Sequence, residues 1–440
     1  MRQDAEKRRL YGQSRRRILK RSEQSVWDPS RRSHDPVEVI LSANKDRLSG
    51  LLPIKMARMA ASPFGFFRGS VPLMAVDLAL LPATGIEVQI CGDAHVRNLG
   101  AFAAPDGRLV FDINDFDETI RAPWEWDVKR MSASLVLAGR EAGNAERLCK
   151  ESVLEFARSY RGLMLQFSSM AAVEVARYRI HRPFEGAAGL AVLRKAERAT
   201  PLHSLERMTR TAAGGKRVFR TIKPVLTHPS RHTVKQVLRS LGSYRETLPP
   251  ERQHVLDFYR PEDVAFKIVG TGSVGTRDYI VLCFGNGIAD PLFLQIKEEP
   301  PSGYTPYVKS HPAKHQGERV VFGQRRMQTH SDILLGWTSI AGRDYLVRQL
   351  ADHKGCIEDA DLKDVGLIQY ARTCGEVLAK GHARSGDACA LAGYLGERNI
   401  FDQAIAKFAA SYADQTVKDY QCFKRAIRRG RVKIARSTYL

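Results

Sequence analysis

Two short polar segments, far apart in the chain, contain the residues that most constrain its fold. The first reads CGDAHVRNLG (91–100) and is followed by VFDINDFDE (110–118). The second reads VGTGSVGTRDYIVLCF (269–284) and is followed by LFLQIKEE (292–299). Each combines turn-forming residues with apolar runs typical of strands. If both segments serve one site, the first quarter of the chain must pack face to face against its second half.

The glycine-rich segment is compatible with two structures. Gly270, Gly272 and Gly275 match the G-x-G-x-x-G spacing of dinucleotide-binding folds, in which the glycines lead into a helix. Residues 276–284 alternate and branch like a strand, so we predict a strand–loop–strand hairpin instead. Glycines let backbone N–H groups approach phosphate oxygens, and Lys297 at the end of the next strand would neutralise those oxygens. An ordinary glycine-rich hairpin with a surface lysine is the alternative.

The acidic segment has the residue types that bind Mg²⁺. Asp93 and Asn98 lie five residues apart, so one loop can offer a carboxylate to an acceptor group and an amide oxygen to a cation. Asp115 and Asp117 alternate after the apolar strand 109–113, which predicts that both face the same side. Such hard oxygen ligands suit Mg²⁺ that is shared with substrate phosphates. A solvated turn is the alternative, since an Asn-Asp pair is good turn chemistry.

These segments resemble the motifs of kinase-like phosphotransferases. GDAHVRN followed by INDFDE is similar to the GD-x-H-x-x-N and I-D-[FW]-[DE] elements of the aminoglycoside and choline kinase-like enzymes. Protein kinases also use an Asp-x-x-x-x-Asn loop, a metal-binding Asp, a glycine-rich loop and a strand lysine. Here the glycine-rich loop and Lys297 come last, so the resemblance implies a circular permutation. A permutation keeps the site when chain ends lie close together at the surface.

Over almost its whole length the chain also resembles the bacterial domain of unknown function 2252 family. This resemblance is carried by CGDAHVRNLG, FDINDFDET, VGTGSVGTRDY, RMAASPFGFFRGS (58–70), PWEWDVKRMSAS (123–134), RVVFGQRRMQ (319–328) and LAKGHARSGDA (378–388). The family name implies no particular activity. The functional expectation therefore rests on the kinase-like motifs.

The resemblance to kinases implies a role for each motif residue. Asp93 would position or deprotonate the acceptor, and His95 would orient Asp93 or contact phosphate unless its role is structural. The remaining residues divide into a metal set, Asn98, Asp115 and Asp117, and a triphosphate set, Gly270, Gly272, Ser273, Gly275 and Lys297. The expected cofactors are ATP and Mg²⁺. The expected reaction is phosphoryl or nucleotidyl transfer to an unidentified acceptor, either a small molecule or a protein.

The acid that would pair with the strand lysine is not evident. Residues 319–328 form the natural helix for it, yet they offer Phe322 and Gln324 in the middle, and Glu318 only at the start. The two glutamates directly after Lys297 follow it too closely to be expected to face it. The alternative function is therefore a non-catalytic nucleotide-binding adaptor, a pseudokinase, whose basic tails bind nucleic acid or an acidic partner.

The apolar pattern predicts an α+β protein with two lobes, in a circularly permuted protein-kinase-like arrangement. The expected regions are a partly ordered basic segment (1–40), the catalytic-loop and metal-site half of a helical lobe (41–195), a linker-like basic segment (196–255), a strand-rich nucleotide-binding lobe (256–355) and helices that complete the helical lobe (356–440). Expected strands cover 87–90, 265–269, 278–284, 291–297 and 345–350, with a hairpin over 101–111. Helices are expected from Trp126 and Ala145, over 367–382 and over 401–412.

Aromatic and charged residues occur together in two further motifs. The aromatic residues are expected in the core, namely Phe64, Phe66, Phe67, Trp124 and Trp126. The charged residues are candidates to line the acceptor site, namely Arg68, Asp127, Lys129 and Arg130.

The net charge of +21 is concentrated at the ends of the chain. Residues 1–32 hold eleven Lys/Arg and four Asp/Glu (11 − 4 = +7), and residues 421–440 hold seven and none (+7). Such ends favour weak, salt-dependent binding to nucleic acid or anionic surfaces, unless they are simply solvated. The seven cysteines form no C-x-x-C pair, and no signal peptide or membrane-length apolar run occurs. We therefore expect a cytoplasmic protein without a membrane span.

Overall fold

The computed structural model describes residues 4–104, 106–180, 200–268, 270–309, 313–350 and 355–435, together with residues 192, 194, 196 and 197. All five predicted regions, the hairpin at 101–111 and the strand at 265–269 extend in part beyond the described residues, at 1–3, 105, 181–191, 193, 195, 198–199, 269, 310–312, 351–354 and 436–440. The helices are α1 (Ala5–Ser14), α2 (Pro36–Ser42), α3 (Leu52–Ala60), α4 (Pro63–Gly69), α5 (Val71–Ala79), α6 (Glu125–Glu141), α7 (Glu146–Ser169), α8 (Ala172–Arg177), α10 (Pro201–Met208), α11 (Arg231–Glu246), α12 (Pro250–Asp257), α13 (Gln316–Met327), α14 (Val365–Ser385), α15 (Ala388–Leu395) and α16 (Ile400–Arg428).

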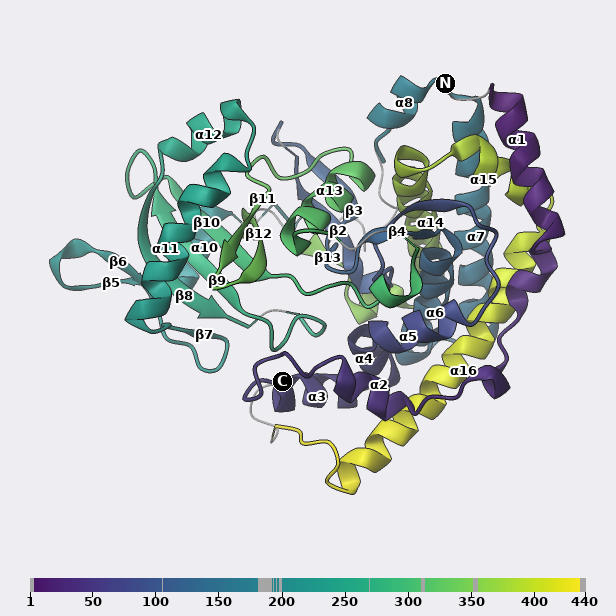
Figure 1. Cartoon of the computed structure of the whole chain (residues 1–440), viewed down its shortest axis with the longest axis horizontal. Helices are drawn as coiled ribbons and strands as arrows, with labels where there is room; N and C mark the ends of the chain where they lie inside the picture. Colours follow the sequence, from purple (N-terminus) through teal and green to yellow (C-terminus); the bar gives the residue numbers. More distant parts are fainter. Residues whose placement is uncertain are drawn as a thin grey trace.

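The strands confirm the predicted α+β class. They are β1 (Glu87–Ile90), β2 (Leu99–Ala103), β3 (Leu109–Ile113), β4 (Ile120–Pro123), β5 (Thr209–Thr211), β6 (Arg217–Phe219), β7 (Leu226–Thr227), β8 (Arg260–Lys267), β9 (Asp278–Phe284), β10 (Pro291–Glu298), β11 (Gly336–Ile340), β12 (Arg343–Gln349) and β13 (Gly355–Cys356). Figure 1 shows the sheet that contains β8 to β12 on one side of the molecule and the long helices on the other.

The main sheet of the described residues is antiparallel, with strand order β11-β12-β10-β9-β8-β7. Side chains alternate between its faces. One face packs on α11, where Val281 and Leu294 join a buried cluster with Tyr244. The other face packs partly on α10 and, toward the end of β10, presents Lys297 opposite Asp278. Both faces of the sheet are thus packed against helices, and the charged pair Lys297 and Asp278 lies at the end of β10.

Residues 196–255 differ from the linker-like segment that their polar composition suggested. They contain α10, β5, β6, β7, α11 and most of α12. Val237 and Tyr244 are fully buried and lie seven positions apart on α11, which places them on one helix face. A composition averaged over sixty residues hides this spacing, because few apolar residues are enough to dock an amphipathic helix.

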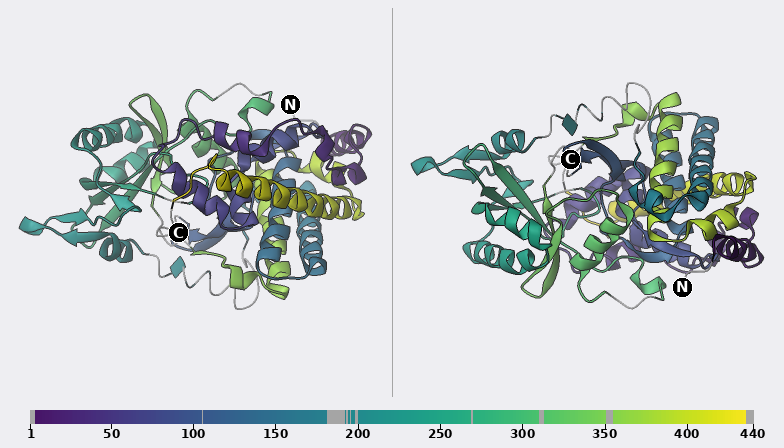
Figure 2. Two further views of the ribbon diagram at one scale, coloured as in Figure 1. Left: turned by 90° about the horizontal axis from the view of Figure 1, so that it is seen from below. Right: turned by 90° about the horizontal axis from the view of Figure 1, so that it is seen from above.

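A second large core forms where α6, α7, α14, α15 and α16 pack together (Figure 1). Trp124 is fully buried and stacks on Tyr160, with 5.7 Å between ring centroids. The predicted burial is confirmed for Phe64, Phe66, Phe67, Trp124 and Trp126. Helix α16 continues well past the predicted 401–412 and runs along one side of the helix-rich part (Figure 2). The described helices include none with the length and apolar character that spanning a bilayer requires.

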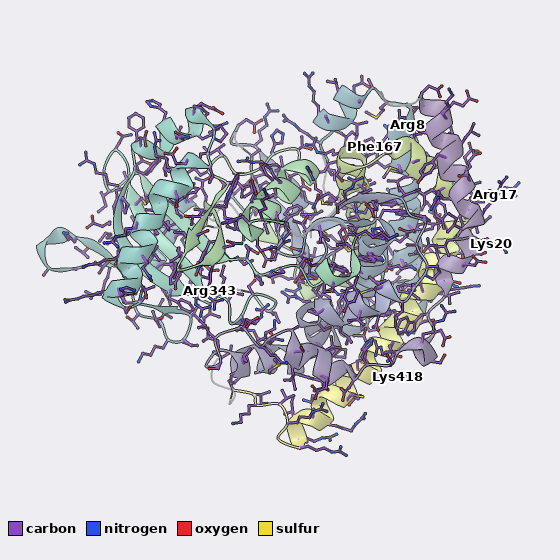
Figure 3. All side chains as sticks on the ribbon, in the orientation of Figure 1. Arg8, Arg17, Lys20, Phe167, Arg343 and Lys418 are labelled. Atoms are coloured by element: carbon purple, nitrogen blue, oxygen red, sulfur yellow. The ribbon has the colours of Figure 1, made fainter. Side chains whose placement is uncertain are left out.

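From residue 4 onward the N-terminal basic segment is folded and packs on the helix-rich part, which corrects the expectation of partial order there. Arg16 Nε and Arg21 Nη1 donate to carbonyls at the end of α15, at 2.9 and 2.7 Å. Helix C-termini leave such carbonyls without intrahelical donors and favour cations. Counting charges along the sequence does not reveal these acceptors. Arg17 and Lys20, in contrast, are exposed and project outward (Figure 3).

Candidate functional site

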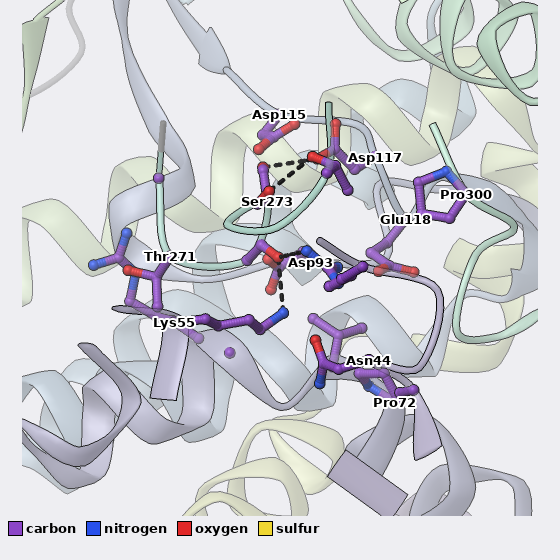
Figure 4. A pocket seen from close by; sticks show the side chains of 18 of the residues that line it. Asn44, Lys55, Pro72, Asp93, Asp115, Asp117, Glu118, Thr271, Ser273 and Pro300 are labelled. Carbon is purple, nitrogen blue, oxygen red and sulfur yellow. Dashed lines mark hydrogen bonds between the residues drawn. The ribbon is translucent and has the colours of Figure 1, made fainter. Parts of the chain in front are cut away.

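The acidic loop, the aspartates after β3 and the glycine-rich loop line one cavity of about 130 Å³ (Figure 4). The predicted site residues that border it are Asp93, His95, Asn98, Asp115, Asp117, Gly270, Gly272 and Ser273. Gly275 borders an adjoining cavity of about 710 Å³. Lys297 contacts both aspartates, and its Nζ lies 3.5 Å from Asp115 Oδ1 although 182 positions separate them (297 − 115). The two polar segments of the sequence therefore meet in the folded chain.

The loop after β1 has its shape because one glycine permits it. Gly92 has φ +80°, and a Cβ atom there would lie 2.2 Å from the Glu118 carbonyl oxygen. The backbone N–H groups of Cys91 and Gly92 donate to the two carboxylate oxygens of Asp127, at 2.8 and 2.9 Å. Asp127 is fully buried at the start of α6. The core thus fixes the backbone that presents Asp93.

Asp93 is held by a buried arginine. Arg130 Nε and Nη2 both donate to Asp93 Oδ1, at 2.9 and 2.5 Å. Burial alone would raise the pKa of Asp93, but the charges and hydrogen bonds of Arg130 and His95 together outweigh burial and lower it. The carboxylate is therefore ionised at neutral pH and is a weak base.

His95 lies next to the same carboxylate. Its Nδ1 accepts the Arg97 N–H at 3.1 Å, and its Nε2 lies 3.5 Å from Asp93 Oδ2. Burial lowers the pKa of His95 despite the nearby carboxylate. The ring is therefore neutral at pH 7 with its proton on Nε2, directed toward Asp93.

Asn98 joins the acidic loop to the aspartates after β3. Its Nδ2 donates to the carbonyl oxygens of Asp93 and Asp115, both at 3.0 Å. The side-chain oxygen of Asn98 receives no hydrogen bond from the described residues, and neither does the buried Oδ1 of Asp117. Oxygen atoms of this kind fit Mg²⁺. The described residues contain no group of three or more His, Cys, Asp or Glu placed around a metal, so phosphates and water would complete its coordination.

Lys297 neutralises the two aspartates. Its ammonium hydrogen-bonds to Asp117 Oδ2 and is almost fully buried. Burial would raise the pKa of Asp117, but Lys297 lowers it to about 2. Burial and the neighbouring Asp117 raise the pKa of Asp115. Burial lowers the pKa of Lys297, but both carboxylates act in the opposite direction and the net shift is upward. The three groups form one tightly coupled charge cluster.

The glycine-rich loop connects β8 and β9, as the hairpin interpretation predicted. Gly270 has φ +62° and Gly275 has φ +95°, a region that favours glycine. Ser273 Oγ donates to Asp117 Oδ2 at 3.3 Å, so the loop closes onto the aspartates (Figure 4). The loop, the strand lysine and the aspartates therefore meet at a single carboxylate.

The acid next to Lys297 does not come from α13. Phe322 is exposed there, and α13 instead provides Arg319, which donates to the Asp117 carbonyl at 2.8 Å. The glutamates after Lys297 were not expected to face it easily, yet Glu299 lies close enough to affect the lysine electrostatically. Lys297 and Glu299 lie two positions apart, so on an extended chain their side chains point to the same side. Buried Glu299 contributes to raising the pKa of Lys297.

A second buried acid lies opposite Lys297 on the sheet. Asp278 is 2% exposed, and it accepts a hydrogen bond from Gln295 Nε2 at 2.7 Å. Burial raises its pKa to about 7, while Lys297, Lys267 and Arg348 act in the opposite direction. In the unfolded chain the same carboxyl titrates at about 3.9.

We expect Asp278 to make the folded protein less stable as the pH rises. The folded pKa is above the unfolded one, so its stabilising protonation is complete below about pH 4 and lost by about pH 7. The shift corresponds to a loss on the order of 4 kcal/mol. Urea unfolding of wild type and Asp278→Asn between pH 4 and 8 would measure it, because the variant should lack this pH dependence. Parallel curves would contradict the assignment.

The four charged residues proposed for the acceptor site have different positions. Arg68 lines the cavity, whereas Arg130 contacts Asp93 and Asp127 holds the loop backbone. Lys129 lies over the Phe408 ring, with Nζ 4.9 Å from its centroid. Of the four residues, Arg130 and Asp127 support the acidic loop, and Arg68 borders the cavity.

Sequence reasoning missed three polar lining residues between α2 and α4. Asn44, Arg47 and Lys55 border the cavity and come from a segment without motif-like spacing. Lys55 is 2% exposed at the apolar face of α3. A lysine at a position whose helical spacing predicts burial is the one signal that could have identified it.

With this geometry in view, the chain belongs to the family described as uncharacterized proteins conserved in bacteria (DUF2252), whose model matches residues 47–426. The match includes both polar segments and the α13 and α14 motifs. Neither a curated protein nor a solved structure matches the chain.

Proposed function

We propose that this protein is an ATP–Mg²⁺-dependent phosphotransferase with a circularly permuted, kinase-like arrangement. The observation that carries the proposal is the meeting of Lys297, Ser273 and Asp117 at one carboxylate. These residues come from a strand end, a glycine-rich loop and the segment after β3, and phosphoryl transfer uses the same three parts. A chance meeting of unrelated turns does not account for a lysine buried against two aspartates.

The order of elements in the strand-rich part supports the same interpretation. Strand β8, the glycine-rich loop, β9, the lysine strand β10 and then α13 follow one another along the chain. Protein kinases place a glycine-rich loop, a lysine on the third strand and a helix in this order. The acidic loop precedes them here, and helix α14 packs close to α7 and β1 behind that loop. A permuted two-lobed kinase-like protein is the arrangement that unites these facts.

The residues divide into nucleotide-binding and metal-binding groups in this proposal. Lys297 and Ser273, with the backbone of the glycine-rich loop, would bind the triphosphate, and Lys297 would exchange its carboxylate partners for phosphate oxygens. Asn98, Asp115 and Asp117 would hold Mg²⁺. A bound magnesium ion supplies charge neutralisation at the phosphates during transfer. Glycine loops and aspartates then keep the transferring group in position.

Asp93 would position the acceptor hydroxyl. Its Oδ1 is engaged by Arg130, so Oδ2 is the oxygen that can accept a hydrogen bond from an acceptor. Because Arg130 keeps Asp93 ionised and weakly basic, its main contribution is orientation, with the proton leaving late in transfer. His95, neutral with Nε2–H toward the same oxygen, limits where the acceptor can approach.

A non-catalytic nucleotide-binding adaptor is the second candidate, and one observation favours it. Arg130 holds Asp93 with two hydrogen bonds to one oxygen, a contact that an acceptor would have to tolerate. A second observation counts against the nucleic-acid role of this adaptor. Several basic residues that were expected to bind nucleic acid contact the protein itself, as Arg16 and Arg21 show. Turnover of ATP with any acceptor would exclude the adaptor.

Replacing Lys297 by alanine tests the proposal. Loss of a charge-assisted phosphate contact should weaken MgATP binding by about tenfold to a hundredfold in titration calorimetry. Lys235→Ala, which removes an exposed lysine of α11, is the matched control and should bind normally. Lys297→Arg keeps the charge cluster and should bind with an intermediate affinity. Equal MgATP affinity in wild type and Lys297→Ala would overturn the nucleotide site.

A further inference from the structure

Three basic side chains from the segment around α3 contact the glycine-rich loop. Arg47 Nη1 donates to the carbonyls of Gly272 and Val274 at 2.7 and 2.8 Å, and Lys55 Nζ donates to Gly272 O at 2.9 Å. Arg58 Nη1 donates to the Gly270 carbonyl. Neutral carbonyl oxygens are modest partners for three cations, since charged hydrogen bonds are strongest to anions.

The carboxylates around the cavity, in contrast, each have a partner other than Arg47 and Lys55. Their partners are Arg130 for Asp93, Lys297 for Asp115 and Asp117, Ser302 Oγ and Gly303 N for Glu118, and Arg277 with Arg343 for Glu298. Within the part of the chain that the structure describes, Arg47 and Lys55 make no ion pair. The acids that line the cavity are bound by other groups, so Arg47 and Lys55 are two basic side chains without an ion-paired anion among the described residues.

Lys55 has the strongest need for an anionic partner. It is 2% exposed, and its ammonium has three N–H groups but one acceptor, the Gly272 carbonyl. Burial and the neighbouring Arg47 lower the pKa of Lys55 well below its usual range, against the weaker influence of Glu118 and Asp93. An oxyanion next to Nζ would restore the ammonium form, because opposite charges favour ionisation. Figure 4 shows Lys55 reaching into the cavity near the loop that carries Asp93.

We propose that Lys55 and Arg47 form a second oxyanion subsite, which binds a phosphate group beneath the tip of the glycine-rich loop on the side of Asp93. This inference deepens the proposed function and rests on it for the direction of transfer. The phosphate would come either from the γ-position of the nucleotide or from an acceptor that itself bears phosphate. In both cases the two cations lie where negative charge gathers during transfer, and they stabilise it.

The size of the cavity limits which class of acceptor can reach Asp93. Helices α2 to α5 wall the inner space of about 130 Å³, and a larger adjoining cavity of about 710 Å³ shares Arg47 and Glu118 with it. A small anionic molecule can occupy both spaces, with its reactive end in the inner one. The segment around α3 would have to move for a folded protein to reach Asp93.

The test compares Lys55→Met with Lys45→Met in the full chain. Methionine keeps most of the length of Lys55 and removes its buried amino group, so folding should be retained. Lys45 is exposed ten residues earlier, and its loss removes the same charge. Calorimetry measures the affinity of each protein for three probes. They are MgATP, MgADP, and inorganic phosphate added in the presence of MgADP. We expect Lys55→Met to weaken at least one phosphate-dependent probe by about tenfold to a hundredfold, with Lys45→Met unchanged.

The pattern of losses identifies the source of the phosphate. Weaker binding of MgATP with unchanged binding of MgADP assigns the subsite to the γ-phosphate. Weaker binding of inorganic phosphate with unchanged binding of both nucleotides assigns it to the phosphate of the acceptor. Lys55→Arg, which keeps the charge, should restore much of the loss. Unchanged affinity for all three probes overturns the subsite. If wild type binds no nucleotide but binds phosphate in a Lys55-dependent way, the proposed function fails and the subsite stands.

Discussion

Asp93→Asn is expected to reduce phosphoryl transfer by about a hundredfold to ten-thousandfold while leaving MgATP affinity nearly unchanged. The substitution removes the charge that orients an acceptor at Oδ2, but it touches none of the groups proposed to bind the triphosphate. Release of radiolabelled phosphate or product from γ-labelled ATP, measured over a panel of small phosphorylated and hydroxyl acceptors, provides the rate. The matched control is Asp106→Asn, an exposed carboxylate in the β2–β3 hairpin.

The same substitution leaves Arg130 buried without its carboxylate partner, so stability has to be followed as well. Arg130 is fully buried and its loss of an anion could cost about 3–5 kcal/mol. Retained MgATP affinity shows that a slow variant is folded. Turnover equal to wild type would remove Asp93 from the mechanism. Wild type without turnover on any acceptor, but with Lys297-dependent ATP binding, would favour the adaptor.

The local elements were predictable because their sequence periods are strong. β9 and β10 alternate apolar and β-branched residues around a Gly-Asn-Gly turn, and the structure has strands at 278–284 and 291–298. Helix α14 was expected from apolar residues at helical spacing, whereas residues 319–328 were expected to be a helix from the kinase-like order of elements. The predicted helix at 401–412 was too short, because the spacing weakens after residue 412 while packing of Phe423 on Phe66 continues it.

Part of the site was predictable for a chemical reason. Mg²⁺ and phosphates require carboxylates, glycines and a lysine in recognisable spacing, so Asp115 and Lys297 could be expected together across 182 positions (297 − 115). The cations around α3 have no such spacing. Lys55 and Arg47 reach the glycine-rich loop only through the tertiary fold, and a single sequence contains no signal of that contact.

The N-terminal charges illustrate a different limit. A net charge says nothing of the acceptors that a fold supplies, and here the acceptors are helix-end carbonyls and buried carboxylates. Arg32 is the extreme case. Its guanidinium donates to Asp77 Oδ1 at 2.8 Å and to Asp419 Oδ1 at 2.7 Å, which ties the N-terminal segment to α5 and α16. Its hydrogen bonds raise the pKa of Arg32 although burial opposes this.

Arg32→Met should destabilise the protein by about 3–5 kcal/mol, because it leaves the buried carboxylates of Asp77 and Asp419 without their arginine partner. The side chains of all three residues are at most 7% exposed. Arg31→Met is the matched control, since its neighbouring ion pair with Asp28 is exposed and should be worth less than about 1 kcal/mol. Urea unfolding at pH 7 measures both variants.

The cause of the loss can be tested with the triple variant Arg32→Met, Asp77→Asn and Asp419→Asn. It removes the buried charges together, and it should recover a large part of the stability because the main cost is an uncompensated buried carboxylate. Equal stability of Arg31→Met and Arg32→Met would show instead that the N-terminal segment contributes little to the fold. The segment could then act as the detached basic tail that charge alone suggested, and its removal would leave nucleotide binding intact.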